Sequence, residues 1–330
     1  MDRPSPPSLA AEPLPISYIL PIAAAFPQTR ALTGYLRRLS RQVDEVIVVD
    51  GSPADVFEAH DAAWSGHVRH LRPLCPTPNG KVGGVVTGIF AARHEHVVIA
   101  DDDVRYRRAE LSRLVGLLAQ VDVVRPQNWF HPLPWYARWD TARSLLNRVS
   151  GGDWPGTLGL RRSRFLAAGG YAGDVLFENL ELVRTIEAVG GREIVACDLF
   201  VVRRPSTAAH FRNQRVRQAY DELARPRRLV AQLALLPLAV ALTRKRRFGA
   251  LALLAAGSVV AAEAGRRRGE ARTVFPPTSA LWAPAWIAER AVTAWLALGT
   301  RLLLGGVRYR SGRLARSATS RAALAARHAR

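Results

Sequence analysis

Two short apolar segments, each followed directly by aspartate, constrain the fold of this chain most strongly. Residues 46–49 (Val-Ile-Val-Val) precede Asp50, and residues 97–100 (Val-Val-Ile-Ala) precede the triplet Asp101 to Asp103. Continuous apolar runs of this length are typical of buried strands in a parallel sheet that helices cover on both faces. Both segments are therefore predicted to be strands, and their aspartates to lie at strand carboxyl ends.

The flanking segments predict helices and strands in alternation. Residues 16–22 predict the first strand, and leucines recur at helical spacing within residues 29–39. Residues 68–74 predict an edge strand, and residues 85–93 predict a helix that leads into the strand at residue 97. Such alternation is typical of an α/β domain with a doubly wound, mostly parallel sheet.

The aspartates mark the expected ligand site, because ligands of open α/β sheets bind beyond the carboxyl ends of the strands. Asp101 and Asp103 are spaced to share one hard divalent cation, which would in turn bind phosphates. Taken alone, the triplet fits a solvated acidic turn at least as well, and Asp50 fits a turn or helix cap. Residues 76–84 predict a flexible glycine-containing loop that brings the Lys81 ammonium close to an anion, although the spacing is not that of a P-loop.

Taken together and in order, four short motifs resemble those of the inverting family 2 glycosyltransferases, which have the GT-A fold. The motifs are Ile19-Leu20-Pro21, Val48-Val49-Asp50-Gly51-Ser52, Asn79-Gly80-Lys81 and Asp101-Asp102-Asp103. The resemblance implies that Asp50 contacts the nucleoside of a nucleotide sugar and that Lys81 binds its diphosphate. It also implies that Asp101 and Asp103 hold Mg²⁺ or Mn²⁺ against that diphosphate. The family usually has two aspartates before the glycine, and here there is one.

A later segment, residues 177–182, resembles the family's Glu-Asp-x-Asp-Leu motif, whose first aspartate is usually the catalytic base. This base removes the proton of the acceptor hydroxyl during attack on the anomeric carbon. Asn179 occupies its position, and an amide cannot act as a base, so we expect Glu178 or Glu181 to act instead. Carboxylates in a first helical turn are also favoured by the helix dipole without any catalytic role.

Residues 214–218 resemble the QxxRW motif of membrane-associated members of the family. Gln214 and Arg217 match this motif, which implies that they contact the diphosphate, whereas Gln218 replaces the tryptophan beside the acceptor. Four aromatic residues upstream can stack on sugars, pack in a core or lie at a membrane interface. They are Trp129, Trp135, Tyr136 and Trp139.

The remainder of the chain is basic and apolar. The net charge of +20 suggests an anionic partner, and two widely separated cysteines fit a reducing cytoplasm. Residues 229–242 and 248–262 are apolar segments of about 15 residues each, around the basic residues 244–247, and residues 280–306 form a third. The first two are shorter than the ~20 residues that a bilayer requires, so they predict a shallow hairpin on anionic lipid headgroups. The alternative is a set of soluble core helices.

These observations divide the chain into a disordered lead (1–15), a GT-A domain (16–225), membrane-associated helices (226–306) and a basic tail (307–330), which is disordered or interfacial. The predicted activity is transfer of a sugar from a UDP- or GDP-linked donor to a lipid-linked or cell-envelope glycan acceptor, with inversion. The predicted location is the cytoplasmic membrane, with the catalytic domain on the cytoplasmic side and no nucleic-acid partner. Two alternatives are a sugar-phosphate nucleotidyltransferase and a nonenzymatic membrane or anion-binding protein that retains the fold.

Overall fold

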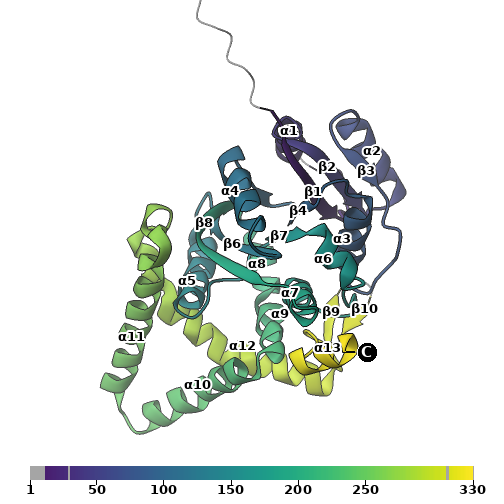
Figure 1. The fold of residues 1–330 in the computed structure, drawn as a ribbon. Helices are drawn as coiled ribbons and strands as arrows, with labels where there is room; N and C mark the ends of the chain where they lie inside the picture. The colour runs from purple at the N-terminus through teal and green to yellow at the C-terminus, as the bar shows by residue number, and fades with distance from the viewer. Residues whose placement is uncertain (1–11, 29, 310–311, 330) are drawn as a thin grey trace, which may run out of the picture.

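A single mixed sheet organises the structure, which is a computed structural model that describes residues 12–28, 30–309 and 312–329. The sheet has eight strands in the order β3-β2-β1-β4-β7-β6-β8-β5 (Figure 1). The strands are β1 (Leu14–Ile22), β2 (Val43–Asp50), β3 (Arg69–Leu71), β4 (His96–Ala100), β5 (Val104–Arg105), β6 (Val123–Phe130), β7 (Thr157–Arg161) and β8 (Glu193–Arg203). The predicted lead lies largely outside the described residues, and β1 begins at Leu14 rather than at the predicted Ile16.

The sheet is parallel over its N-terminal half, which confirms the predicted doubly wound arrangement. Strands β3, β2, β1 and β4 are parallel neighbours. Strand β7 then runs antiparallel to β4 and β6, β6 and β8 are parallel, and β5 runs antiparallel to β8. The aspartates that follow β2 and β4 therefore lie at the same edge of the sheet, as the sequence predicts.

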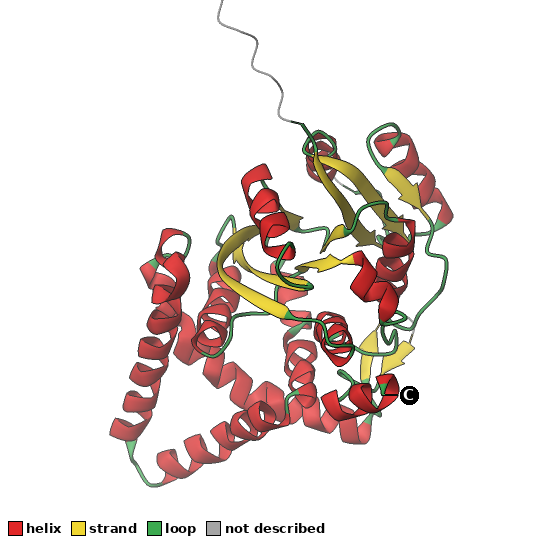
Figure 2. Ribbon diagram, in the orientation of Figure 1, coloured by secondary structure: helices red, strands yellow, loops and turns green. Residues whose placement is uncertain are grey.

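Helices cover both faces of the sheet (Figure 2). The helices of this part are α1 (Arg30–Leu39), α2 (Ala54–Trp64), α3 (Gly80–Ala91), α4 (Arg108–Leu118), α5 (Trp135–Val149), α6 (Arg162–Ala167) and α7 (Glu178–Ala188). Leucines of α1 and α4 pack on one face of β1, against Tyr18 and Leu20. Apolar residues of α3 and α7 pack on the other face, against Ile19. The alternating side-chain directions of β1 thus supply two separate cores.

The predicted glycine-containing loop is in part the first turns of α3, which corrects one expectation. Asn79 caps this helix, because its side chain accepts a hydrogen bond from the backbone N–H of Lys81. The glycines are required by close packing rather than by flexibility. A Cβ atom at Gly84 would lie 2.9 Å from Cβ of Pro21, and one at Gly88 would lie 2.4 Å from Cγ2 of Ile19. The helix therefore lies directly on β1, which brings Lys81 to the carboxyl edge of the sheet.

The C-terminal third is helical and ends in a folded segment. Its elements are α8 (Ala208–Asn213), α9 (Arg215–Tyr220), η1 (Asp221–Ala224), α10 (Pro226–Arg244), α11 (Phe248–Arg267), η2 (Arg268–Thr273), η3 (Pro277–Trp282), α12 (Ala283–Leu303), β9 (Val307–Tyr309), β10 (Gly312–Leu314) and α13 (Arg321–His328). Of the two alternatives predicted for the tail, disorder is wrong for its described residues, and an interfacial position stays a prediction. Leu314 and Leu324 are buried, and the Tyr309 hydroxyl donates to Oδ1 of Asn79 at 2.9 Å. These contacts join the tail to the N-terminus of α3.

Helices α10 and α11 extend away from the sheet and meet at a tip, as Figure 1 shows. Both are long and apolar enough to cross a membrane by length and composition, which is weak evidence by itself. They have 19 and 20 residues, more than the predicted 15, because polar residues at their ends continue the helices. In the most apolar 18-residue stretch of each region, only 6% (the α10 region) and 17% (the region that begins with α11) is buried in the structure. Most of the apolar surface of these two helices is therefore exposed in the structure.

Two of the four aromatic residues on α5 and its approach pack in a core, whereas Trp135 is about half exposed. Trp129 and Trp139 belong to an apolar cluster with residues of α11, η3 and α12, including Trp282. The rings of Trp139 and Trp282 lie 6.1 Å apart. Of the alternatives considered for these residues, core packing describes Trp129 and Trp139, and this core fixes α12 against α5.

Candidate active site

A cavity of about 240 Å³ lies beyond the carboxyl end of β4. Its wall contains Asp101 and Asp103 from the segment after β4, Glu178 from the start of α7, and Arg203 from the end of β8. Gly156 also lines it, and a Cβ atom there would lie 2.5 Å from Oδ2 of Asp101. The loop before β7 can therefore pack against the acidic segment only because residue 156 is glycine.

Ion pairs connect the acidic residues of the cavity. Nζ of Lys81 lies 2.5 Å from Oδ1 of Asp101 and 2.7 Å from Oε1 of Glu178. Nη2 of Arg203 lies 3.3 Å from Oδ2 of Asp101, and its Nε lies 2.9 Å from Oδ2 of Asp103. Residues from β4, α3, α7 and β8, far apart in the sequence, thus form one charge network.

The pKa values show how tightly these charges interact. Burial alone would lower the pKa of the Lys81 ammonium, but the carboxylates of Asp101 and Glu178 raise it well above the usual range. The pKa of Asp101 is lowered, because the charges of Lys81 and Arg203 outweigh its burial. Burial raises the pKa of Asp103 despite the favourable charge of Arg203. Of these two carboxylates, Asp103 is therefore the one whose ionised form is less well stabilised by the protein.

The donor set at Asp101 and Asp103 fits a hard divalent cation. Oδ1 of Asp103 is buried and has no hydrogen-bond partner among the described residues. An unpartnered buried carboxylate oxygen is costly unless a ligand or cation binds to it. Carboxylate oxygens are the ligands that Mg²⁺ and Mn²⁺ prefer. Lys81 and Arg203 neutralise part of the same charge, so a cation would bind here together with an anionic substrate.

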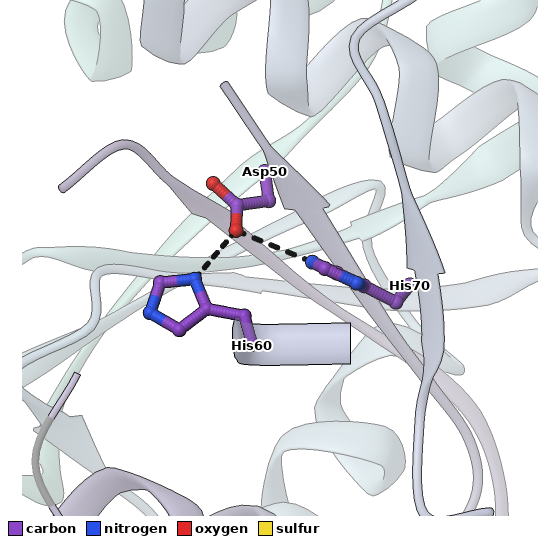
Figure 3. A group of neighbouring side chains, drawn as sticks. All are labelled: Asp50, His60 and His70. Atoms are coloured by element: carbon purple, nitrogen blue, oxygen red, sulfur yellow. Dashed lines mark hydrogen bonds and ion pairs between the residues drawn. The ribbon is translucent and has the colours of Figure 1, made fainter. Parts of the chain in front are cut away.

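Asp50, expected to contact a nucleoside, is fully buried and does not line the cavity. Figure 3 shows its carboxylate between two histidines from α2 and β3. Oδ2 lies 2.6 Å from Nδ1 of His60 and 3.2 Å from Nε2 of His70, and Oδ1 accepts a hydrogen bond from the backbone N–H of Ser52. Although burial opposes this effect, these hydrogen bonds lower the pKa of Asp50 far below its usual range. The sequence gives no local signal for the two histidines.

The ligating atoms of Asp50, His60 and His70 lie within 4.8 Å of one another, a spacing that suits a metal ion. The hydrogen bonds argue for a different role. The backbone N–H of Gln28 donates to Nε2 of His60 at 2.8 Å, so the proton of this imidazole is on Nδ1 and points at Asp50. Both nitrogens of His70 face carboxylates, since its Nδ1 lies 2.9 Å from Oδ1 of Asp61. His60 in this tautomer has no lone pair for a metal at Nδ1, and the cluster stabilises the packing of β2, α2 and β3.

The structure separates the two glutamates expected as catalytic bases. Glu178 lines the cavity, and only its Oε1 atom is bound by Lys81. Glu181 is fully buried, does not line the cavity, and accepts a hydrogen bond from the backbone N–H of Thr319 at 2.6 Å. Its role is therefore to join α7 to the C-terminal segment. Asn179 also lines the cavity, and its Nδ2 donates to the backbone carbonyl of Pro155.

The motif at residues 214–218 does reach the cavity, together with residues that sequence reasoning missed. Gln214 and Arg217 both line the wall, next to Asp221 from η1. Burial raises the pKa of Asp221 to about 7, the positive charge of Arg217 opposes this rise, and the negative charge of Glu178 adds to it by a smaller amount. Asp221 and Arg203 occur among many charged residues without a motif of their own, so only their placement in the fold identifies them.

The comparisons with known proteins agree with this architecture. Residues 28–167 match the family model described as glycosyl transferase family 2. One similar solved structure is a mannosyltransferase from Pyrobaculum calidifontis in complex with GDP-Man and Mn²⁺. The match covers 87% of this chain and 88% of the mannosyltransferase chain, with a TM-score of 0.54 and 20% sequence identity. Glucosyl-3-phosphoglycerate synthase from M. tuberculosis covers 60% and 75% (TM-score 0.39, 21% identity), and S. aureus TarS in complex with UDP-GlcNAc covers 60% and 60% (TM-score 0.41, 15% identity). No curated protein matches the sequence.

The mixed sheet, with its acidic segment after β4, has the GT-A fold, which it shares with the P. calidifontis mannosyltransferase. Residues 28–167 match glycosyl transferase family 2, and this match identifies the protein as a glycosyltransferase. The alternative of a sugar-phosphate nucleotidyltransferase is therefore not retained.

Proposed function

We propose that the protein transfers a sugar from a nucleotide diphospho-sugar, UDP- or GDP-linked, to an acceptor hydroxyl, with inversion at the anomeric carbon. The observation that carries this proposal is the joining of Asp101, Lys81 and Glu178 by ion pairs at one cavity. Groups suited to a metal, a diphosphate and a proton thus occupy one site. The P. calidifontis mannosyltransferase, which has the same fold, binds GDP-Man with Mn²⁺.

Asp101 and Asp103 would hold Mg²⁺ or Mn²⁺, which supplies positive charge against the leaving diphosphate. Lys81 and Arg217 would bind the diphosphate, with Gln214 beside it. When the donor binds, its phosphates would replace one of the carboxylates that now face Lys81. Charge that develops on the leaving group is then stabilised in a partly buried site, where electrostatic interactions are strongest.

Glu178 is the proposed base. As the acceptor oxygen forms its bond to the anomeric carbon, the bond from that carbon to the diphosphate breaks, and the acceptor proton passes to Glu178. Its Oε1 atom is held by Lys81 at 2.7 Å, which fixes the carboxylate while Oε2 stays available. Asp221 is a second carboxylate in the same wall, and its pKa of about 7 also suits proton transfer near neutral pH.

The exposed apolar surfaces of α10 and α11 support a location at the cytoplasmic membrane, with the catalytic domain on the cytoplasmic side. Basic residues 244–247 lie at the tip between the two helices. There they would contact anionic headgroups if the hairpin lies within the membrane surface. The acceptor would then be lipid-linked or part of the cell envelope.

Release of nucleoside diphosphate from a panel of nucleotide sugars tests the proposal. We expect release from one donor with Mn²⁺, loss on chelation, and loss in Asp103→Asn. Asp198→Asn is the matched control, because Asp198 is about half exposed and pairs with Arg113 outside the cavity. If Asp103→Asn releases nucleoside diphosphate as fast as the wild type does, the metal assignment is contradicted. Absence of release and of donor binding by the folded protein would favour a nonenzymatic binding protein.

A second comparison assigns the base. Glu178→Gln should reduce turnover by at least a hundredfold, a typical contribution of a positioned base. Glu187→Gln on the same helix is the control, because Glu187 pairs with Arg321 away from the cavity. If Asp221→Asn abolishes turnover while Glu178→Gln does not, the base is Asp221.

A further inference from the structure

The same cavity extends from the acidic segment to the inner side of α12, where one arginine is buried without a partner. Arg290 is only 1% exposed and lines the cavity. Its Nε and Nη1 atoms are buried and have no hydrogen-bond partner among the residues that the structure describes. The neighbouring Trp286 is also in the wall, and its indole N–H is buried and equally unpartnered.

Three other arginines of this wall, Arg143, Arg203 and Arg225, have carboxylate partners. Arg143 lies 3.4 Å from Asp153, and Arg225 lies 2.7 Å from Glu222. Glu289, next to Arg290 in the sequence, binds the indole N–H of Trp139 and also faces Arg215. Arg290 is thus a desolvated cation without an ion-pair partner among the described residues, although the charges of Glu289 and Glu222 act on it from a greater distance. The guanidinium lies 5.0 Å from the ring centroid of Trp286, an arrangement that orients it but does not neutralise it.

A buried guanidinium of this kind is costly, and burial accordingly lowers the pKa of Arg290 to about 10. Water alone in the cavity would hydrogen-bond to the donors, but the charge would be offset only in part, by the more distant carboxylates of Glu289 and Glu222. A bound anion satisfies both requirements, because phosphate oxygens accept several N–H donors from arginine at once.

The position of Arg290 indicates where this anion comes from. Arg290 lies on the inner side of α12, and the outer side of the same helix exposes Val292, Trp295 and Leu296. Trp295 donates a hydrogen bond to the backbone of α10, one of the two exposed apolar helices. An amphiphile whose chain lies on these helices would place its polar head close to the cavity.

The geometry points to Arg290 and Trp286 as the binding site for a phosphate group borne by a lipid acceptor. That this lipid is the sugar acceptor rests on the proposed function, but binding of the lipid phosphate requires neither a sugar donor nor sugar transfer. The phosphate would lie at the α12 end of the cavity, and the donor diphosphate at the Asp101 end. A lipid-borne phosphate, rather than free phosphate, is the ligand that the adjacent apolar helices favour.

Binding of dodecyl phosphate below its micelle concentration, measured by titration calorimetry without nucleotide sugar, tests the inference. We expect wild type to bind dodecyl phosphate at least tenfold more tightly than inorganic phosphate. Arg290→Met should weaken dodecyl phosphate binding roughly tenfold or more, as expected for loss of charged hydrogen bonds. Arg290→Lys should retain part of the affinity. Arg301→Met is the control, because Arg301 is an exposed arginine of the same helix outside this cavity.

Folding of the variant is a second readout. Since Arg290→Met removes a buried charge that has no ion-pair partner among the described residues and keeps a long side chain, its thermal midpoint should rise in the absence of ligand. A lower midpoint would indicate a structural role and would overturn the inference, as would equal binding of dodecyl phosphate by Arg290→Met and wild type. Inorganic phosphate binding as tightly as dodecyl phosphate would contradict the lipid source. Arg290-dependent binding without any sugar transfer would support this site while contradicting the proposed function.

Discussion

Asp221 should make the protein less stable at pH 8 than at pH 5. Its Oδ1 atom is buried without a hydrogen-bond partner among the described residues, and burial raises its pKa from 3.8 to about 7. A carboxyl whose pKa is raised by folding costs nothing below pH 4, where it is protonated in both states. Stability then falls as the pH rises from about 4 to 7, because the unfolded chain loses its proton first.

The size of this effect follows from the shift. At about 1.4 kcal/mol for each pKa unit, the full cost above pH 7 is about 4 kcal/mol, as an upper bound. The variant Asp221→Asn keeps the shape and removes the charge. Compared with wild type, it should be stabilised much more at pH 8 than at pH 5, by roughly 5 °C in the midpoint of thermal unfolding.

Differential scanning calorimetry at the two pH values measures this difference directly. Other groups titrate in the same range, so the quantity to compare is the variant's gain over wild type at each pH. Asp198→Asn, at an exposed ion pair, should show no pH-dependent gain. An equal gain at both pH values for Asp221→Asn would refute the reasoning, because Asp221 would then be ionised in the folded protein throughout.

Three further predictions follow from packing and hydrogen bonding. Gly88→Ala should lower the free energy of unfolding by about 1–3 kcal/mol because its Cβ would clash with Ile19, whereas Gly116→Ala, with open space, should be neutral or stabilising in the same denaturation assay. Glu181→Ala leaves the buried N–H of Thr319 unpaired and should cost about 1–3 kcal/mol in that assay, and no loss of stability would contradict the assigned role. Imidazole titration by NMR should place His70 above pH 6.5, because Asp50 and Asp61 favour its charged form despite burial, and His210 below it. The stability that His70 contributes is then fully present below pH 6.5 and is lost as the pH rises through the pKa of His70 in the folded protein. A titration midpoint of the His70 imidazole at or below pH 6.5 would contradict its hydrogen bonds to Asp50 and Asp61.

The parts of the fold that depend on local pattern could be predicted from the sequence. The apolar runs before Asp50 and Asp101 identified β2 and β4, because a buried parallel strand requires such a run. The glycines of residues 76–84 led to the wrong prediction for the start of α3. Glycines in isolation indicate a flexible loop, but here they are required by the close contact of the helix with β1. The tail was predicted as disordered or interfacial because its charge gave no sign that Leu314 and Leu324 would be buried.

The residues of the candidate site could be predicted where they belong to a sequence motif. They could not be predicted where only the tertiary structure brings charged residues together. Asp101 and Glu178 reach one cavity as expected, and Lys81 bridges them. Asp50 does not, because His60 and His70 enclose it, and their positions depend on how α2 and β3 pack. Arg203 and Arg290 come from the end of a long strand and the inner side of a helix. In a chain with 47 lysines and arginines, composition could not single them out.

The most direct test of the central claim is a titration with Mn²⁺ monitored by electron paramagnetic resonance, with UDP or GDP present. The nucleotide and the cation should bind together to wild type and to His70→Asn, and Asp103→Asn should lose this binding. If Asp103→Asn binds Mn²⁺ as wild type does, or if only His70→Asn loses it, the cation is not held at Asp101 and Asp103. The cavity would then not be the nucleotide-sugar site.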